Sequence, residues 1–327
     1  MNPTHFQDLS YDLTLIDTGY HRPGCTGSYL MESMGRAAFI ETGHANAVPR
    51  LMDALEYRGL SPNTVDYVIV THVHLDHAGG AGALLEKLPN ALLVVHPAGA
   101  QHMVDPSRLI AGTRVVYGDD QFQKNFGSVV AVDPSRVIAV PDGYLLTLGD
   151  RQLTILDTPG HARHHICIWD AYSRGLFTGD AFGLSYRAFD GLEGPYIFPA
   201  TTPIQFDPMT AIQTVDRLSA LNPTQLFLTH FGMINWNTVV RDAMITQLKM
   251  IQSWRERTEW RGQTGPQRRR WIEAQVKQWI VEGLRTHMHG ALTAQDRTLL
   301  NMDMELNAQG IDCWLAALEK QTAGYSA

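Results

Sequence analysis

The chain contains little cysteine, only Cys25, Cys167 and Cys313 among 327 residues. An odd number of cysteines at such long spacings excludes a disulfide framework and a sulfur-rich zinc site, and it fits a reducing compartment. Basic residues are also in the minority, with 26 Lys and Arg against 33 Asp and Glu and a formal net charge of −7. This balance argues against a chain built mainly to bind nucleic acid.

Long apolar runs are absent as well. No run approaches the length of a membrane-spanning helix, and the first residues, MNPTHFQDLSYD, lack the basic start and apolar stretch of a signal peptide. The remaining composition, 44% apolar and 18% charged, is that of an ordinary globular chain. We therefore expect a cytoplasmic protein that binds neither a membrane nor nucleic acid.

The hydrophobic pattern predicts a mixed α/β core followed by helices. Helical spacing indicates helices over 46–59 and 81–88, and β-rich runs indicate strands. The expected strands cover 13–17, 28–33, 36–42, 65–70, 91–95, 136–148, 152–156, 176–178 and 226–229. From about residue 239 the composition shifts to helical segments rich in Gln, Arg and Trp, so we expect a main domain over 1–240 and a helical extension over 241–327.

Histidine is what the chain has in excess, with 14 copies, several of them in two short clusters. The segment from His72 to His77 places three imidazoles and the carboxylate of Asp76 directly after an apolar strand. Side chains two apart on an extended segment point the same way, so His72 and His74 can converge on one ion. Asp76 and His77 follow a change of direction and could serve a second ion. The alternative is a polar loop that caps the next helix.

Three further candidate ligands, His161, Asp180 and His230, each follow the end of an apolar strand or its adjoining turn. Imidazole and carboxylate ligands suit zinc, iron or manganese. Together with the first cluster, these residues are enough for a site with two metal ions.

The order of these motifs resembles the metallo-β-lactamase-fold superfamily over roughly residues 10–235. The resemblance is carried by His-x-His-x-Asp-His from His72, Thr-Pro-Gly-His ending at His161, Phe-Thr-Gly-Asp ending at Asp180, and Thr-His ending at His230. It implies an αββα sandwich of two mixed β-sheets with outer helices. It also implies a site at one edge of the sandwich, where the strand-end loops gather, and makes 1–240 the catalytic domain.

The resemblance also implies a ligand set for two divalent ions, with zinc favoured and iron or manganese as alternatives. One ion would be held by His72, His74 and His161, the other by Asp76, His77 and His230, and Asp180 would bridge them. A hydroxide between the ions would be the nucleophile, because a divalent cation lowers the pKa of bound water to roughly 7. Asp76 could in addition orient this hydroxide or hand a proton to the leaving group.

Several nearby residues have two interpretations. Tyr186, in the aromatic loop segment 181–208, is the best candidate for an oxyanion donor by analogy with lactonase-like members, or the aromatics cover the sheet edge. Arg163, His164 and His165 are expected to orient the metal ligands or to contact substrate. Glu41 replaces an aspartate common in relatives and is expected to tie its turn.

The Trp-rich extension with its Arg268-Arg269-Arg270 run could bind an anion, but packing or a homodimer contact is the stronger expectation.

We expect a metal-dependent hydrolase that uses a metal-bound hydroxide on an ester, thioester or lactone of small size, with glyoxalase-II-like hydrolases as the nearest general match. One alternative is a persulfide dioxygenase with a single iron on His72, His161 and Asp180. Another is a non-catalytic ligand sensor that keeps the metal site and signals through residues 241–327.

Overall fold

The computed structural model describes residues 5–202, 204–257, 259–260, 263 and 265–324. The ends of the two predicted domains, residues 1–4 and 325–327, lie outside the described residues. The chain forms two compact units. The first comprises Met1–Thr158, His164–Gly179 and Asn222–Trp236, and the second comprises Pro159–Arg163, Asp180–Leu221 and Asn237–Ala327. The domain boundary at residue 240 stays a prediction.

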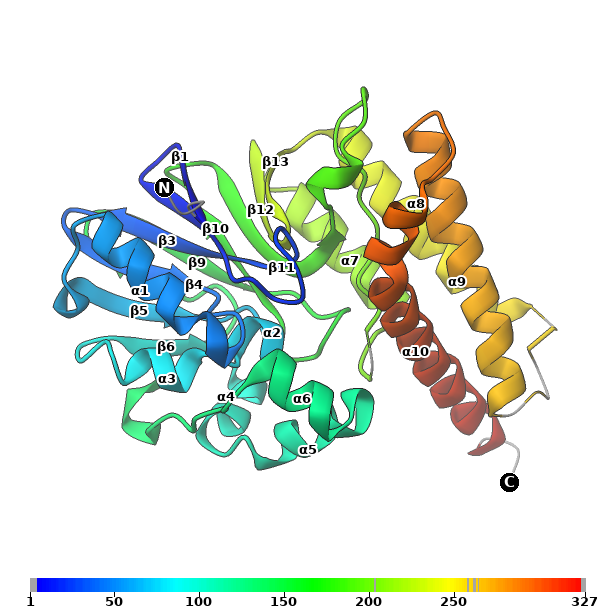
Figure 1. Cartoon of the computed structure of the whole chain (residues 1–327), viewed down its shortest axis with the longest axis horizontal. Coiled ribbons are helices and arrows are strands. Elements are labelled where there is room, and N and C mark those ends of the chain that lie inside the picture. Colours follow the sequence, from blue (N-terminus) through cyan, green and yellow to red (C-terminus); the bar gives the residue numbers. More distant parts are fainter. Residues whose placement is uncertain (1–4, 203, 258, 261–262, 264, 325–327) are drawn as a thin grey trace. The chain divides into compact units, whose positions relative to one another are not determined.

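A mixed seven-stranded sheet forms one half of the first unit (Figure 1). Its strands follow one another in chain order: β1 (Phe6–Leu9), β2 (Leu13–Asp17), β3 (Gly27–Ser33), β4 (Arg36–Ile40), β5 (Val65–Ile69), β6 (Leu92–Val95) and β7 (Val137–Ala139). Strands β1 to β4 pair antiparallel, and β4 to β7 pair parallel. The carboxyl ends of the parallel strands therefore lie at one edge, where the histidine motif begins.

The second sheet has six strands. Their order is β13 (Gly232–Asn235), β12 (Gln225–His230), β11 (Gly175–Leu184), β10 (Ile166–Asp170), β9 (Arg151–Asp157) and β8 (Leu145–Leu148). Neighbours from β8 to β11 pair antiparallel, as do β12 and β13. The predicted architecture of two mixed sheets with helices is confirmed. Strands β1, β10 and β13 were not among the strands expected from the sequence.

Strand alternation produces two separate cores in the first unit. Ile16, Leu30 and Phe39 belong to a cluster that also contains the apolar faces of α1 (Val48–Tyr57) and α3 (Ala81–Leu85). Their neighbours Leu15 and Tyr29 point to the opposite face, into a cluster shared with strands of the second sheet. Helix α1 packs on β2 and β3, and α3 packs on β6 (Figure 1). The period of two thus buries both faces of this sheet.

The remaining helices of this unit are short. They are α2 (Leu75–Ala78), α4 (Pro97–Val104), α5 (Ser107–Tyr117) and α6 (Asp119–Phe126). Single 3₁₀ turns occur here at Ala45–Ala47, Pro62–Thr64 and Pro134–Arg136, and in the second unit at Arg187–Phe189 and Trp254–Glu256.

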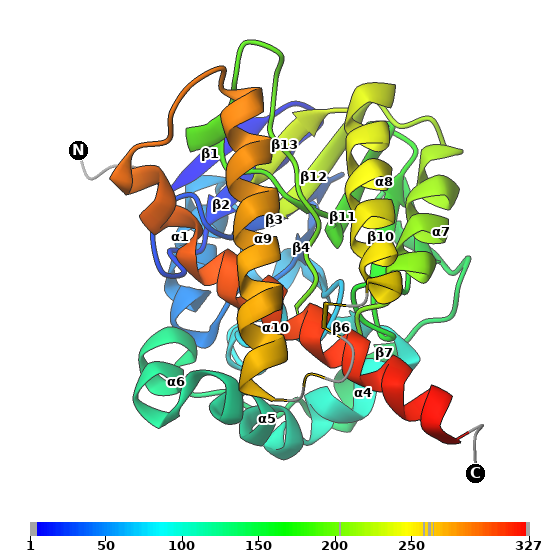
Figure 2. The ribbon, with the colours of Figure 1, turned by 90° about the vertical axis from the view of Figure 1, so that its right-hand side faces the viewer.

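The described residues of the second unit form four α-helices: α7 (Pro208–Ser219), α8 (Thr238–Ser253), α9 (Pro266–His287) and α10 (Ala294–Gly324). Helix α9 buries one face, with apolar residues at four-residue intervals from Ile272 to Leu284. Helix α9 crosses α10 (Figure 2), and Arg268 joins them through bonds to Asp312 (2.6 Å) and Glu319 (2.7 Å). Arg268 of the basic run therefore serves packing.

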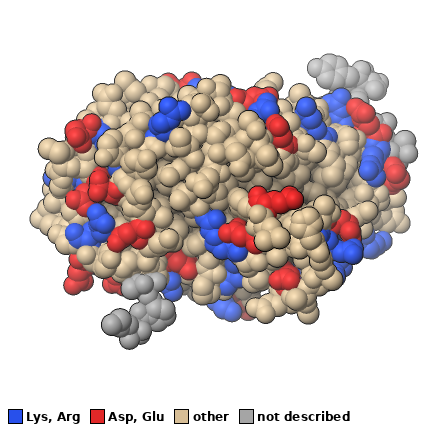
Figure 3. Space-filling view, turned by 90° about the horizontal axis from the view of Figure 1, so that it is seen from above, with Lys and Arg blue, Asp and Glu red and all other residues tan. Residues whose placement is uncertain are grey.

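In the part of the chain that is described, no helix combines the length and the apolar character needed to cross a bilayer. On the face shown in Figure 3, acidic and basic side chains are interspersed and are not gathered by sign.

Candidate metal centre

The histidine motif spans the segment that joins β5 to α2 and continues into α2, which contains Asp76 and His77. Because His74 has extended backbone angles (φ −60°, ψ 145°) and α2 begins at the next residue, the chain changes direction between His74 and Asp76. Gly80 lets this turn lie against the end of β4, since a Cβ atom there would be 3.1 Å from the carbonyl oxygens of Thr42 and His44. The turn therefore presents its polar side chains from a closely packed backbone.

Asp76, His77 and His230 converge within the first unit. His230 is the last residue of β12, and its Nε2 lies 3.3 Å from the Nε2 of His77. The Oδ2 of Asp76 lies 3.6 Å from the Nε2 of His77 and 3.5 Å from that of His230. Burial alone would raise the pKa of Asp76, but whenever His77, His230 and His74 carry protons, their positive charges outweigh burial and hold that pKa below its usual range.

The hydrogen bonds of the two rings fix which nitrogens carry protons. His77 donates from Nδ1 to the Glu41 carboxylate (3.0 Å), and His230 donates from Nδ1 to the Cys25 carbonyl (3.1 Å). In a neutral imidazole the other nitrogen then bears a lone pair. Two lone pairs and the Asp76 carboxylate consequently face one another, which is repulsive unless a cation lies among them. These donors fit a divalent metal ion.

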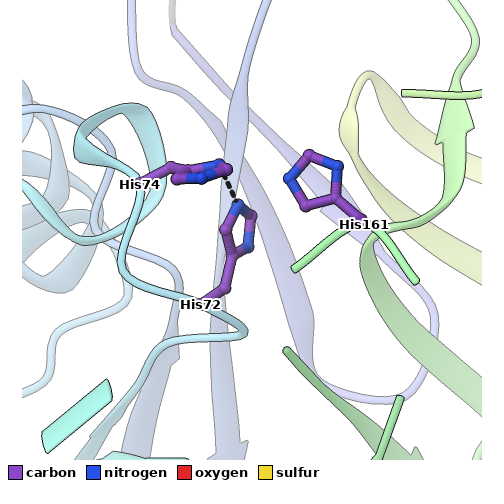
Figure 4. A group of neighbouring side chains, drawn as sticks. All are labelled: His72, His74 and His161. Carbon is purple, nitrogen blue, oxygen red and sulfur yellow. Dashed lines mark hydrogen bonds between the residues drawn. The ribbon is translucent and has the colours of Figure 1, made fainter. Parts of the chain in front are cut away.

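His72 and His74 also point toward each other (Figure 4). The Nε2 of His72 is 2.8 Å from the Nδ1 of His74, with the ring planes nearly perpendicular at 80°. The Nδ1 of His72 contacts the Thr71 hydroxyl at 3.0 Å. As expected for an extended segment, side chains two apart thus point the same way.

His161 and Asp180 belong to the second unit, and Figure 4 also labels His161. There the Nε2 of His161 lies 3.5 Å from the Oδ2 of Asp180, and its Nδ1 donates to the Ala200 carbonyl at 3.0 Å. His161 therefore also has its proton on Nδ1. That these two residues complete the ligand set remains a prediction from the sequence.

Tyr186, in the same unit, donates its hydroxyl hydrogen to the Asp303 carboxylate at 2.9 Å, and both side chains are buried. Its role as an oxyanion donor remains a prediction, and it would require the hydroxyl to turn away from Asp303.

The second histidine cluster lies beside the first. The His165 ring is centred 5.0 Å from that of His72, and its Nδ1 contacts the Thr158 hydroxyl at 2.8 Å. The His164 ring is centred 5.9 Å from that of His74. These contacts fit the expected orienting role. Arg163 lies in the second unit, where its backbone N–H donates to Gln205.

Sequence reasoning undervalued Glu41. It does tie its turn, as expected, because its N–H donates to the Ile69 carbonyl at 2.8 Å. Its side chain is also 1% exposed and lies against His77 and Thr71, which the sequence did not indicate. The signals in the sequence were an acidic residue at the end of a predicted strand and its place where relatives commonly have an aspartate.

The sequence model of the metallo-beta-lactamase superfamily matches residues 26–230. The chain belongs to the metallo-beta-lactamase superfamily. All the first-unit residues of the candidate centre lie within the matched segment, apart from Cys25. Groups of His with Asp or Glu that could hold a metal ion occur in this member of the superfamily, among them Asp76, His77 and His230.

Several known proteins match parts of the chain. The metallo-beta-lactamase fold-containing protein ST1585 of Sulfurisphaera tokodaii is 28% identical over 52% of this chain and 62% of its own length. The acyl-coenzyme A thioesterase MBLAC2 of Gallus gallus is 35% identical over 34% and 40%, respectively. The hydroxyacylglutathione hydrolase of Klebsiella pneumoniae is 29% identical over 50% and 49%. The chain thus spans less than two thirds of each of these relatives.

The fold of ST1585 has also been solved, as an archaeal superfamily protein from Sulfolobus tokodaii. That structure matches 93% of this chain and 99% of its own with a TM-score of 0.64 and 21% identity, which supports the shared fold.

Proposed function

We propose that the protein is a metal-dependent hydrolase of a small ester, thioester or lactone, cleaving the bond between the carbonyl carbon and the ester oxygen or thioester sulfur. Thioesters are the first class to test. The observation that carries this proposal is the convergence of Asp76, His77 and His230. The tautomers of the two histidines leave their Nε2 lone pairs facing each other and the Asp76 carboxylate. The relatives named as an acyl-coenzyme A thioesterase and a hydroxyacylglutathione hydrolase support the choice of substrate class.

We place one divalent cation on Asp76, His77 and His230, and a second on His72 and His74, with His161 and Asp180 as the remaining ligands predicted from the sequence. Zinc suits these donors best, and iron or manganese can also be accepted. When bound, such cations supply Lewis acidity that activates water and polarises a carbonyl group.

The residues of the chain itself contribute positioning and charge. The Nδ1 bonds to Glu41 and Cys25 hold the rings of His77 and His230, so the Nε2 atoms do not need to reorganise when a ligand arrives. The Asp76 carboxylate can accept a hydrogen bond from a water molecule that enters the site. A carboxylate that also holds a cation is a weaker base, so we assign Asp76 an orienting role first.

The test measures hydrolysis by protein loaded separately with zinc, iron and manganese, read as thiol release from acyl-coenzyme A and acylglutathione and as acid release from lactone and ester substrates. Turnover with at least one thioester, lost in Asp76→Ala and retained in His289→Ala, is expected. His289 is a suitable control because its side chain is 62% exposed. Metal binding without turnover on the whole panel would contradict the proposal and favour a sensor. Oxygen consumption with glutathione persulfide would contradict it in favour of a dioxygenase.

A further inference from the structure

One buried carboxylate supports two histidines of the candidate metal centre. It contacts one of them directly and the other through a threonine. Glu41 follows β4, and its Oε1 lies 3.0 Å from the Nδ1 of His77, 2.5 Å from the Thr71 hydroxyl and 3.3 Å from the Thr229 hydroxyl. Its Oε2 accepts from the backbone N–H of Thr71 at 3.2 Å. Thr71 in turn contacts the Nδ1 of His72 at 3.0 Å.

The chemistry of a carboxylate fixes which atom donates in each of these hydrogen bonds. A carboxylate accepts hydrogen bonds, so the Thr71 hydroxyl gives its only hydrogen to Glu41. That hydroxyl can then only accept from His72, which must carry its proton on Nδ1. His77 donates to Glu41 directly and carries its proton on Nδ1 as well. Through these two routes Glu41 leaves the Nε2 of both rings as lone-pair donors.

The backbone around Glu41 is held in an unusual conformation that aims the side chain at this position. Its φ of 66° lies in the left-handed region, which is strained for a residue other than glycine. Two hydrogen bonds after the Glu41 Cα stabilise this conformation. The Glu41 carbonyl accepts from Ser28 Oγ at 2.6 Å, and the backbone N–H of Thr42 donates to the His77 carbonyl at 2.8 Å. Strained, fully bonded residues of this kind gather at functional sites.

We propose that Glu41 is the shared positioning residue of the candidate metal centre, setting the tautomers of His72 and His77 and thereby preparing both metal positions. The inference rests on the proposed function only in that these histidines hold metal ions. It requires a hydrogen-bond acceptor at the Oε1 position and not a negative charge as such. Removal of the acceptor should weaken metal binding, as loss of such partners typically costs about 10- to 100-fold in affinity.

The direct test is the tautomeric state of the histidines in metal-free protein, read from ¹⁵N chemical shifts at about pH 8, where an ordinary imidazole with a pKa of about 6.5 is neutral. We expect Nδ1–H for His72 and His77 in the wild type. In Glu41→Leu, His77 should shift to Nε2–H, toward the Asp76 carboxylate. Glu41→Gln should restore Nδ1–H, because its amide oxygen can still accept. Glu86→Leu, on an exposed glutamate, is the control that should change neither ring.

Zinc affinity, measured by competition with a chelator, should fall about 10- to 100-fold in Glu41→Leu and stay close to the wild-type value in Glu41→Gln. Wild-type tautomers together with wild-type affinity in Glu41→Leu would overturn the inference. If that variant does not fold, Thr71→Val decides the matter. It should shift only His72 to Nε2–H, and an unchanged His72 would overturn the relay.

The two proposals fail separately. Tautomers are measured without metal or substrate, so expected tautomers in a protein that hydrolyses no substrate would contradict the hydrolase and leave the role of Glu41 intact.

Discussion

His77 and His230 lie 153 residues apart in the chain, yet their Nε2 atoms are 3.3 Å from each other. The Nδ1 atom of each ring donates a hydrogen bond to a residue far away in the chain. His77 donates to the Glu41 carboxylate, and His230 donates to the Cys25 carbonyl. The centre is thus assembled by tertiary structure and is preorganised before any cation arrives. The two Nε2 atoms present their lone pairs to each other. A bound cation therefore removes the repulsion between these lone pairs as well as forming bonds with them.

His230→Ala should remove the ion on Asp76 and His77 and leave the ion on His72 and His74. We expect elemental analysis to show two metal equivalents falling toward one. Zinc should also stabilise the wild type more than the variant, because a ligand at 100 times its Kd adds about 2.7 kcal/mol to the free energy of unfolding. The exposed His289→Ala control should keep both equivalents, and an unchanged metal content in His230→Ala would contradict the placement.

Much of the candidate centre could be predicted because the candidate ligands come at or near the ends of apolar runs in the sequence. The run 65–70 ends at the motif and the run 226–229 ends at His230, and β5 and β12 end there. The parallel edge of a sheet gathers such strand ends. What could not be predicted are contacts between distant segments. His230 and the Cys25 carbonyl are 205 residues apart, and nothing in the local sequence pairs them.

Some of the elements that were missed lack a clear hydrophobic period. Helix α5 (Ser107–Tyr117) has no buried residue, so its apolar residues form no stripe. Strand β10 (Ile166–Asp170) is short and follows directly on a polar histidine cluster, which hides the alternation. The two compact units could not be predicted by a single cut either, because Pro159–Arg163 and Asp180–Leu221 join the unit that holds the C-terminal helices.

Arg151→Met should destabilise the fold by about 3–5 kcal/mol, because it leaves the buried Asp170 carboxylate without its countercharge. Arg151 contacts Asp170 at 2.6 and 3.2 Å, and the two side chains are 3% and 0% exposed. The matched control is Arg36→Met, whose pair with Asp66 is partly exposed and should contribute about 0–1 kcal/mol. Urea unfolding of both variants gives the comparison. An equal loss in the free energy of unfolding in both variants would contradict a larger cost of breaking the buried pair.

His44 should make the protein less stable in acid. Burial lowers the pKa of its imidazole to about 4, against an ordinary value of 6.5. Among the described residues, its Nδ1 is buried without a hydrogen-bond partner. As the pH falls, His44 is protonated in the unfolded chain before it is protonated in the folded protein. Its contribution to stability is therefore complete above about pH 6.5 and is lost as the pH falls toward 4.

At about 1.4 kcal/mol per pH unit, the loss reaches about 3 kcal/mol. Urea unfolding of metal-free wild type and His44→Leu at pH 7, 6, 5 and 4 measures this contribution as the difference between the two curves. The difference should change steadily over that range. A difference that does not depend on pH would show that His44 has an ordinary pKa in the folded protein.

Tyr186→Phe separates two roles for one hydroxyl. In the structure, that hydroxyl donates to the buried Asp303 carboxylate at 2.9 Å, so its loss should lower the free energy of unfolding by about 1–3 kcal/mol and leave kcat near the wild-type value. An oxyanion donor would behave in the opposite way, since removing one typically lowers kcat by about 10²–10³-fold. Unfolding and turnover measured on the same preparation distinguish the roles. A large fall in kcat with unchanged stability would show that the hydroxyl turns from Asp303 toward the substrate during catalysis.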